Sequence, residues 1–151
     1  MTRYREQKLW DAMREGLSDG GLGARIRLER VENGAGEGMP DVLAVCNGLV
    51  TWCELKAVAA LPARPTTRIL GTRGLNQAQR NWHAEWHRAG GRSVVVVGIG
   101  SGRERAHFAL PGHLGDQAND MTWRDFTRHN VARGAGAEFW KVLSAYLRGH
   151  I

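Results

Sequence analysis

The order of hydrophobic and polar residues divides the chain into short segments with two different periods. Apolar residues that return every three or four positions predict helices over 4–17 and 76–89. Alternating or continuous apolar runs predict strands over 24–32, 41–46, 49–56, 92–99 and 104–110. Helices and strands mixed along a chain of 151 residues indicate one domain of the α/β class.

The segment 38–56, GMPDVLAVCNGLVTWCELK, contains two apolar runs joined by Asn-Gly at 47–48. Asn-Gly is the preferred centre of a two-residue type I′ turn, which predicts a hairpin and sets its register. This register places Asp41 opposite Glu54. Because side chains alternate along a strand, Asp41, Glu54 and Lys56 are expected on one face of the hairpin.

Two carboxylates that face each other repel, so the pair of Asp41 and Glu54 needs compensation. Mg²⁺ or Mn²⁺ would supply it, and Mg²⁺ often binds through one or two carboxylates together with a substrate phosphate. Lys56 would then hold or activate the attacking water, or stabilise charge on the phosphate. The alternative is an ion-paired cluster at a strand end, in which Lys56 only neutralises Glu54.

The charge of the chain narrows the choice of partner. A formal net charge of +6 and a pI of about 10.1 favour a polyanion, with nucleic acid ahead of an acidic membrane surface. Residues 1–10 carry charges where a signal peptide needs an apolar core. The longest aliphatic run, SVVVVGIG, is too short to span a membrane. We therefore expect a cytoplasmic protein without membrane segments.

The cysteines and histidines give little sign of a zinc site. The hairpin register separates Cys46 from Cys53 by about 13 Å, which predicts free thiols. His83 and His87 are four residues apart on the second helix, but no third ligand is evident nearby, so both are expected at the surface. The sequence GIGSGR after strand 92–99 lacks the third glycine of a dinucleotide-binding loop and precedes a strand, so we expect a hairpin turn there.

The motif GMPD followed by ELK resembles the PD-(D/E)XK nuclease superfamily. Its surroundings resemble the virus-type replication-repair nuclease (VRR-NUC) branch, which is similar to small Holliday junction resolvases. The resemblance implies a restriction-endonuclease-like core, in which helices flank a mixed central β-sheet. It also implies that Asp41, Glu54 and the backbone carbonyl of Leu55 bind the metal, and that Lys56 is the catalytic lysine.

Three further positions match the branch over a resemblance that covers about residues 4–100. Gly38 matches a glycine before the PD motif. Glu6 matches a glutamate on the first helix, and Gln79 matches a glutamine on the helix after the lysine strand. The resemblance implies that both polar side chains belong to the active site.

Helical spacing tests these two matches independently. Gln79 is the polar member of an apolar stripe on its helix, and Gln77 points elsewhere. The other members of this stripe are Leu75, Trp82 and Trp86. A buried glutamine needs hydrogen-bond partners, which the lysine strand can supply. Glu6 shares a similar stripe with Trp10, Met13 and Leu17, but acids are favoured at a helix start anyway, so a local role is its alternative.

The loop that follows the lysine strand carries Arg64, Arg68 and Arg73. The arginine fork suits phosphate, so these residues are candidates for contacts with the DNA backbone. The alternative is a solvated, mobile connection. Three tryptophans, Trp52, Trp82 and Trp86, are expected in the core.

We expect one nuclease domain over residues 1–151, with its core at about 4–110 and a C-terminal helical extension at about 122–149. Thr122 and Asp125 have the spacing of a capping box. The last helix carries an apolar stripe that would either close the core of the monomer or pair two chains in a homodimer. Its members are Phe139, Val142, Leu143 and Tyr146, widened by Trp140 and Leu147.

Together these features predict a Mg²⁺-dependent DNA endonuclease, in which Mn²⁺ would substitute and no small-molecule cofactor is needed. The chain shows no recognition helix or zinc finger, so DNA shape is the expected cue, as in branched, junction or flapped DNA. The resemblance implies a phage or mobile-element setting in repair or recombination, and hence the host cytoplasm. The alternatives are a non-catalytic DNA-binding module and a restriction-type or RNA-directed nuclease.

Overall fold

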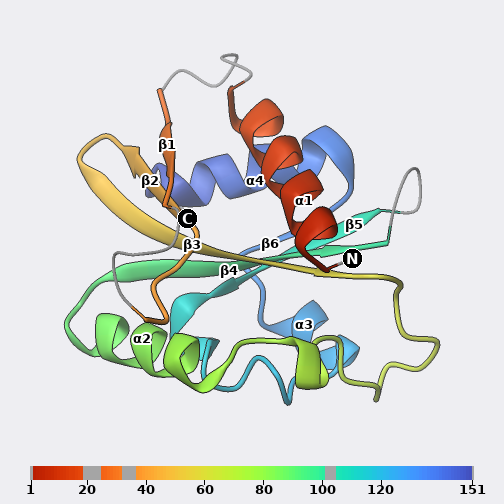
Figure 1. Ribbon diagram of the computed structural model, residues 1–151. Helices are drawn as coiled ribbons and strands as arrows, with labels where there is room; N and C mark the ends of the chain where they lie inside the picture. Colours follow the sequence, from red (N-terminus) through yellow and green to blue (C-terminus); the bar gives the residue numbers. More distant parts are fainter. Residues whose placement is uncertain (1, 19–24, 32–36, 101–104, 151) are drawn as a thin grey trace.

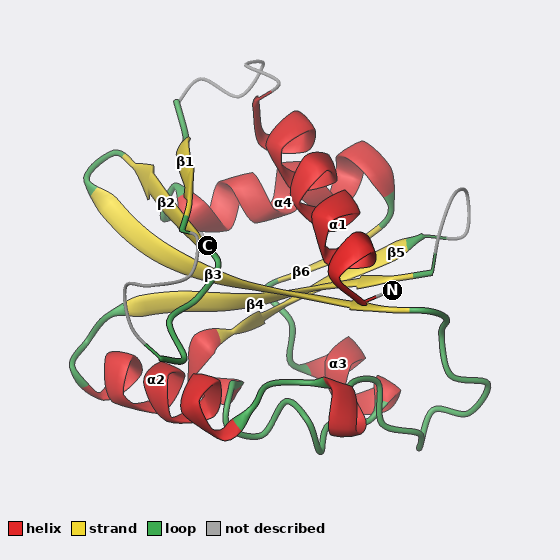
Figure 2. Ribbon diagram, in the orientation of Figure 1, coloured by secondary structure: helices red, strands yellow, loops and turns green. Residues whose placement is uncertain are grey.

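A computed structural model describes residues 2–18, 25–31, 37–100 and 105–150 of the chain. It has the α/β architecture that the sequence predicts, with a six-stranded mixed sheet between two layers of helices (Figures 1 and 2). The helices are α1 (Thr2–Ser18), α2 (Gln77–Arg88), α3 (Trp123–Arg128) and α4 (Gly136–Leu147), with short 3-10 turns at η1 (Gly71–Arg73) and η3 (Gly112–Leu114). This arrangement is compatible with a restriction-endonuclease-like core.

The six strands follow one another across the sheet in chain order, β1-β2-β3-β4-β5-β6. They are β1 (Arg27–Arg30), β2 (Val42–Cys46), β3 (Leu49–Val58), β4 (Arg92–Ile99), β5 (Ala106–Pro111) and β6 (Ala132–Gly134). All neighbours pair antiparallel except β3 and β4, which run parallel. A parallel pair needs a crossover, and α2 provides it.

The helices form two layers that bury different side chains of the same strands. In Figure 1, α1 and α4 lie on one side of the sheet, and α2 and α3 lie on the other. Cys53 and Leu55 of β3 belong to the core under α1 and α4, whereas Val95 and Val97 of β4 belong to the core on the α3 side. Because side chains alternate along β3, Glu54 and Lys56 face the layer of α2.

The β2–β3 hairpin confirms the predicted turn, and it confirms the predicted register from Cys46 to Val42; the expected pair of Asp41 with Glu54 lies one step beyond the end of this ladder. Asn47 and Gly48 both have positive φ, 52° and 79°, as a type I′ turn requires. Cys46 pairs with Leu49, and the ladder continues as far as Val42 opposite Cys53. The prediction of free, buried thiols at both cysteines is likewise confirmed.

Most predicted elements match the structure to within a few residues, and the GIGSGR region follows the expectation of a hairpin. Ile99 of β4 pairs antiparallel with Ala106 of β5, so a strand and not a helix follows the glycines. Residues 101–104 of that connection, and parts of the predicted loops at 18–23 and 33–40, lie outside the described residues. No helix in the described part of the chain has the length and apolar character needed to cross a membrane.

The C-terminal part is more than the predicted helical extension. The capping box is confirmed, since the side chains of Thr122 and Asp125 each accept the other's backbone N–H. The sequence prediction missed β6, a strand of only 3 residues that pairs with β5. Three residues are too few for an alternating pattern to be distinguished from loop.

The apolar stripe of α4 closes the core of the monomer, so it is not available as a surface for a second chain. Four of its side chains are at most 4% exposed, and Val142 and Tyr146 are partly buried against the same core. These four are Phe139, Trp140, Leu143 and Leu147. Of the two alternatives, closure of the monomer core is confirmed and a dimer surface on this stripe is wrong, because the stripe packs against apolar residues of the same chain.

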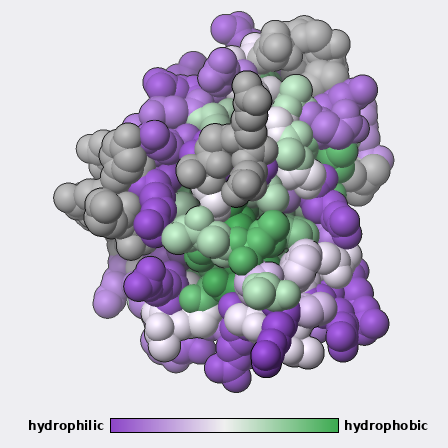
Figure 3. Space-filling model, turned by 90° about the vertical axis from the view of Figure 1, so that its right-hand side faces the viewer, coloured by the Kyte–Doolittle hydropathy of each residue, from purple (hydrophilic) through white to green (hydrophobic). Residues whose placement is uncertain are grey.

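The side of the molecule at which β3 ends has a mixed surface. Figure 3 views the right-hand side of Figure 1, where the loop after β3 and the start of α1 lie. Hydrophobic residues gather in the middle of this face and hydrophilic residues surround them. Leu61, in the loop after β3, is 41% exposed. The two helical layers therefore leave some apolar surface accessible on this side.

Truncation of Phe139 tests the assignment of α4 to the core. Phe139→Ala should lower the free energy of unfolding by about 3–5 kcal/mol, because it empties a fully buried site next to His107 and Trp140. Urea unfolding measures this change. Lys141→Ala on the exposed face of α4 is the control and should change stability by no more than about 0.5 kcal/mol. Equal effects of the two substitutions would contradict the assignment.

Candidate active site

Glu54 is a carboxylate buried in the middle of the sheet. It lies on β3 and is 1% exposed. Its Oε1 atom accepts a hydrogen bond of 2.8 Å from Nε2 of Gln79 and lies 3.5 Å from Nζ of Lys56. Its Oε2 atom is also buried and has no hydrogen-bond partner. A carboxylate oxygen buried in this way loses its hydration without replacement, which is costly unless a proton or a cation compensates.

Gln79 is oriented by the start of its own helix. Its Oε1 accepts the backbone N–H of Asn76 at 2.9 Å, and its own N–H donates to the Asn76 side chain at 2.9 Å. This reciprocal capping box begins α2. Because the carbonyl end of the Gln79 side chain is already occupied, its NH₂ group is the end that meets Glu54. The predicted contact between this glutamine and the lysine strand is confirmed.

Asp41 reaches the site from the point where β2 separates from β3. Its Oδ2 accepts the backbone N–H of Leu55 at 2.8 Å, so its side chain takes a position that a main-chain carbonyl would hold in a longer ladder. Two more steps of the observed register would set Leu55 opposite Pro40, which has no N–H to donate. The N–H and C=O groups of a strand residue point toward the same neighbouring strand. The Leu55 carbonyl is therefore directed toward Asp41, where β2 supplies no N–H to it.

Gly38 lets the chain before Asp41 lie against α2. It has a φ of +80°, and a Cβ at this position would come within 2.3 Å of the Ala78 carbonyl oxygen. Any side chain would push the loop away from the helix at the residue preceding Gln79. The glycine that the motif resemblance singled out therefore has a physical reason in this fold.

The carboxylates of the site all bind protons more tightly than usual. Burial is the main cause in each case. It raises the pKa of Glu54 to about 8, with a further rise from the charge of Asp41 and an opposing effect from Lys56. The pKa values of Asp41 and Glu6 are raised as well, although the Leu55 amide and nearby cations oppose this. Ionisation of these buried groups is thus only partly compensated by the fold itself.

Two basic residues and a third acid complete the surroundings. Lys56 interacts electrostatically with all three carboxylates, and its side chain is only 13% exposed. Glu6 on α1 is near enough to Asp41 and Lys56 for their charges to affect its pKa. Arg30 at the end of β1 acts on Glu6 and Asp41 in the same way. The structure therefore brings Glu6 into the electrostatic group that the sequence proposed, with Arg30 as an added member.

The donor set fits a hard divalent cation of the Mg²⁺ type. It would consist of oxygens alone: the Asp41 carboxylate, the unpartnered Oε2 of Glu54 and the Leu55 carbonyl. No group of three or more His, Cys, Asp and Glu side chains in the described ranges converges on one metal position. A full protein cage is not needed for Mg²⁺, which keeps several waters and binds through one or two carboxylates.

The three arginines of the loop after β3 are exposed, and no described contact joins them to the carboxylates. Arg68 forms a solvent-exposed ion pair of 3.5 Å with Asp120. The loop itself is held to residues 121–124 by backbone hydrogen bonds, among them Trp123 N–H to the Thr67 carbonyl at 3.0 Å. The arginine side chains are solvated, as the alternative expected, whereas a mobile connection stays a prediction. All three side chains are exposed on this loop, and for Arg68 a ligand would compete with the exposed ion pair to Asp120.

Three aromatic and histidine predictions need correction. Trp52 is core at 9% exposure, but Trp82 and Trp86 are only partly buried and stack on each other at 5.0 Å. His83 was expected at the surface and is fully buried, where its Nδ1 lies 2.8 Å from Oγ of Ser93. Its neutral ring fills a gap between α2 and β4 that the helical spacing alone did not reveal. His87, four residues on, is exposed as predicted.

Sequence reasoning missed three residues that shape the site: Pro40, Asn76 and Arg30. A capping-box pattern, Asn-x-x-Gln at 76–79, was readable and would have linked Asn76 to the orientation of Gln79. Pro40 was visible within the motif, but its effect depends on the hairpin register. Arg30 carries no local signal, because its proximity arises only from the pairing of β1 with β2.

Comparison of the chain with models of known protein families and with curated proteins finds no match. The geometry of the site itself therefore indicates what it can bind. That geometry consists of the Glu54 contacts with Gln79 and Lys56 and the Asp41 contact with Leu55.

The buried carboxylate predicts an unusual pH dependence of stability without metal. Because the pKa of Glu54 is raised from 4.5 to about 8, the folded state holds a proton that the unfolded chain releases. The stability that this bound proton contributes is fully present below pH 4.5, and it is lost as the pH rises to about 8. Unfolding measured across this window in chelator should show a decline in wild type that Glu54→Gln largely removes.

Mg²⁺ should reverse this decline, because it binds the ionised carboxylates of the folded state only. At a pH above about 8, added Mg²⁺ should raise the melting temperature of wild type more than that of Glu54→Gln. Comparison of the two proteins cancels the effect of His83 and His107, whose lowered pKa values act at acid pH. Identical curves for both proteins, with and without Mg²⁺, would argue against the site.

Proposed function

We propose that this protein is a Mg²⁺-dependent endonuclease that hydrolyses phosphodiester bonds in DNA, with Mn²⁺ as a substitute metal. The observation that supports this most is Glu54, a buried carboxylate with one oxygen held by Gln79 and Lys56 and the other without a partner. A purely structural ion pair would be expected to satisfy both oxygens, since an unpaired buried oxygen destabilises the fold. Perturbed groups of this kind concentrate at functional sites.

Each residue has a definite part in this proposal. Asp41, Glu54 and the Leu55 carbonyl would hold the cation, which when bound would stabilise negative charge on the phosphodiester as a Lewis acid. Lys56 would orient the attacking water or donate to a phosphate oxygen, as its position beside Glu54 allows. Gln79 positions Glu54, and Glu6 adds negative charge near Lys56.

DNA is the proposed substrate because the chain has a net charge of +6 and an exposed arginine loop leads out of the strand that carries the site. The expected preference for branched, junction or flapped DNA is part of the proposal, as is a phage or mobile-element setting. A homodimer would suit symmetric cleavage of two strands. Its contact would need a surface other than the buried stripe of α4.

Substitution of the acidic residues tests catalysis directly. Asp41→Asn and Glu54→Gln should abolish cleavage while DNA binding persists, because each removes a ligand charge with little change in volume. Lys56→Ala should reduce the rate by about 100-fold or more, the scale of one preorganised electrostatic group. The assay uses labelled duplex, flapped and four-way DNA with matched RNA forms, in Mg²⁺ or in chelator.

A pair of glutamines on α2 provides the matched control. Gln79→Ala removes the donor to Glu54, whereas Gln77→Ala removes only exposed contacts with Asn81 and Arg80. The rate should fall in the first variant and stay unchanged in the second. Wild-type cleavage by Asp41→Asn would overturn the assignment of the site. Metal-independent binding without any cleavage by wild type would favour a non-catalytic DNA-binding module.

The arginine side chains of the loop after β3 should contribute to DNA affinity and not to the stability of the fold. Replacement of Arg64, Arg68 and Arg73 by alanine should weaken DNA binding and reduce the slope of log affinity against log salt by up to about 3, since each phosphate contact contributes about 0.9. Melting temperature should barely change, because all three side chains are exposed. Fluorescence anisotropy at several salt concentrations measures the effect.

The control for this experiment removes the same charge from other elements. Arg14, Arg27 and Arg133 are exposed on α1, β1 and β6. If their replacement by alanine weakens DNA binding as much as the loop variant does, the attraction is a general effect of net charge. Loss of folding in the loop variant would show instead that its arginines are structural.

A further inference from the structure

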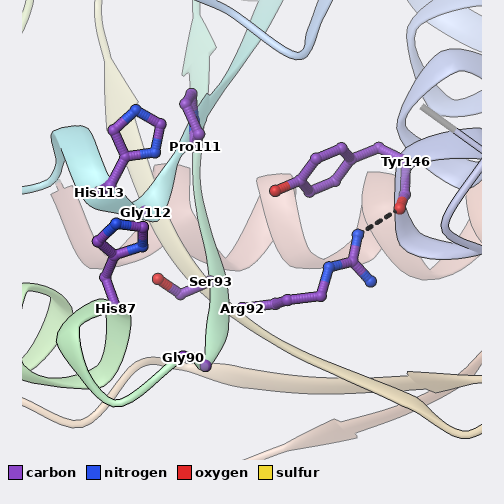
Figure 4. A pocket seen from close by; sticks show the side chains of 9 residues that line it. His87, Gly90, Arg92, Ser93, Pro111, Gly112, His113 and Tyr146 are labelled. Atoms are coloured by element: carbon purple, nitrogen blue, oxygen red, sulfur yellow. Dashed lines mark hydrogen bonds between the residues drawn. The ribbon is translucent and has the colours of Figure 1, made fainter.

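A polar pocket of about 280 Å³ lies at the far end of α2 from the candidate active site. Figure 4 shows that His87 on α2, Ser93 on β4, His113 in η3 and Tyr146 on α4 surround one space. Gln79 and His87 are eight residues apart on α2, a rise of about 12 Å. The pocket is therefore separate from the carboxylate site, although both use the same helix.

Ser93 forms the floor of this pocket and is 4% exposed. Its Oγ lies 2.8 Å from Nδ1 of His83, whose Nε2 is buried without a partner. Unpaired buried N–H groups are rarer than unpaired acceptors, so we assign the ring proton to Nδ1. His83 then donates to Ser93, and the hydroxyl proton of Ser93 is free to be donated into the pocket.

Gly112 lets the start of η3 lie directly against Ser93. A Cβ at Gly112 would lie 1.7 Å from Oγ of Ser93, so any side chain there would displace the serine. The rings of His87 and His113 lie above, with centroids 5.2 Å apart, and both residues are exposed to solvent at the rim. In Figure 4 the Tyr146 hydroxyl points toward the same space from the opposite side. Hydrogen-bond donors therefore approach from several directions.

The charge around the pocket is positive. Arg92 borders it, with one guanidinium nitrogen donating to the Tyr146 carbonyl at 2.6 Å and another buried without a partner. Its guanidinium carbon lies 4.8 Å from the centre of the Tyr146 ring. None of the described residues that line the pocket is acidic. The carbonyls at the end of α2, which would repel an anion, accept backbone N–H groups from residues 89–91.

From this arrangement we propose that the pocket binds a phosphate monoester. A terminal phosphate has three free oxygens and nearly two negative charges, which match the Ser93 hydroxyl, two imidazoles and Arg92. A metal cation is disfavoured beside the guanidinium. The phosphate would come from the end of a nucleic-acid strand or from a free phosphorylated compound.

The test uses wild-type protein in EDTA, so that neither metal binding nor cleavage interferes. Inorganic phosphate should shift the ring NMR signals of His87 and His113 in a saturable way, beyond the effect of chloride at equal ionic strength. The double variant His87→Gln, His113→Gln should weaken binding by about tenfold or more, the effect of losing at least one charge-assisted hydrogen bond. His129→Gln with His150→Gln, two exposed histidines elsewhere, is the matched control and should bind as wild type.

Competition with single-stranded oligonucleotides identifies the source of the phosphate. A strand end is indicated if a 5′-phosphorylated oligonucleotide displaces inorganic phosphate and its 5′-hydroxyl counterpart does not. If neither oligonucleotide displaces it, a free phosphorylated compound is indicated. Equal displacement by both would mean that the pocket takes phosphodiesters, which overturns the proposal. So would unchanged phosphate affinity in the His87 and His113 variant, or the absence of saturable binding in wild type.

Discussion

Burial of the Glu54 carboxylate is the constraint around which this part of the fold is organised. β3 runs through the interior of the sheet and leaves this side chain 1% exposed, so water cannot solvate its charge. The chain supplies only part of what is missing, one amide donor from Gln79 and one ammonium group from Lys56. Asp41 adds further negative charge and raises the pKa of Glu54. A bound cation would supply the compensation for the buried charge that the chain leaves missing.

The backbone near the site is adapted to the same requirement. The β2–β3 ladder stops at Val42, and the Asp41 side chain takes over the Leu55 N–H. Pro40 offers no donor to the Leu55 carbonyl, and Gly38 allows the preceding loop to lie against α2. An ordinary hairpin would have continued the ladder, and the N–H and C=O groups of Leu55 would both have paired with β2. Here the interruption leaves oxygens grouped at one edge of β3.

Helix α2 relates the two polar sites of the molecule. Its capping box orients Gln79 toward Glu54 at one end, and His87 borders the phosphate pocket at the other. Between them His83 is fully buried against Ser93, which ties the helix to the start of β4. The same helix is the crossover between the parallel strands β3 and β4. The position of α2 is therefore set by the sheet topology, and the position of α2 in turn sets where both sites lie.

Local chemistry let the sequence determine the α/β class, the Asn47-Gly48 turn, the hairpin register and the shared face of Glu54 and Lys56. It also determined that Gln79 faces inward, because helical periodicity is a local property. Tertiary structure alone decided that β6 joins the sheet, that α4 covers the core and that His83 is buried. It also decided which charges surround Glu54, since Arg30 and Glu6 meet Asp41 only through strand pairing and helix packing. Contacts between distant segments leave no periodic signal in the chain, so their consequences for burial and charge appear only once the layers are assembled.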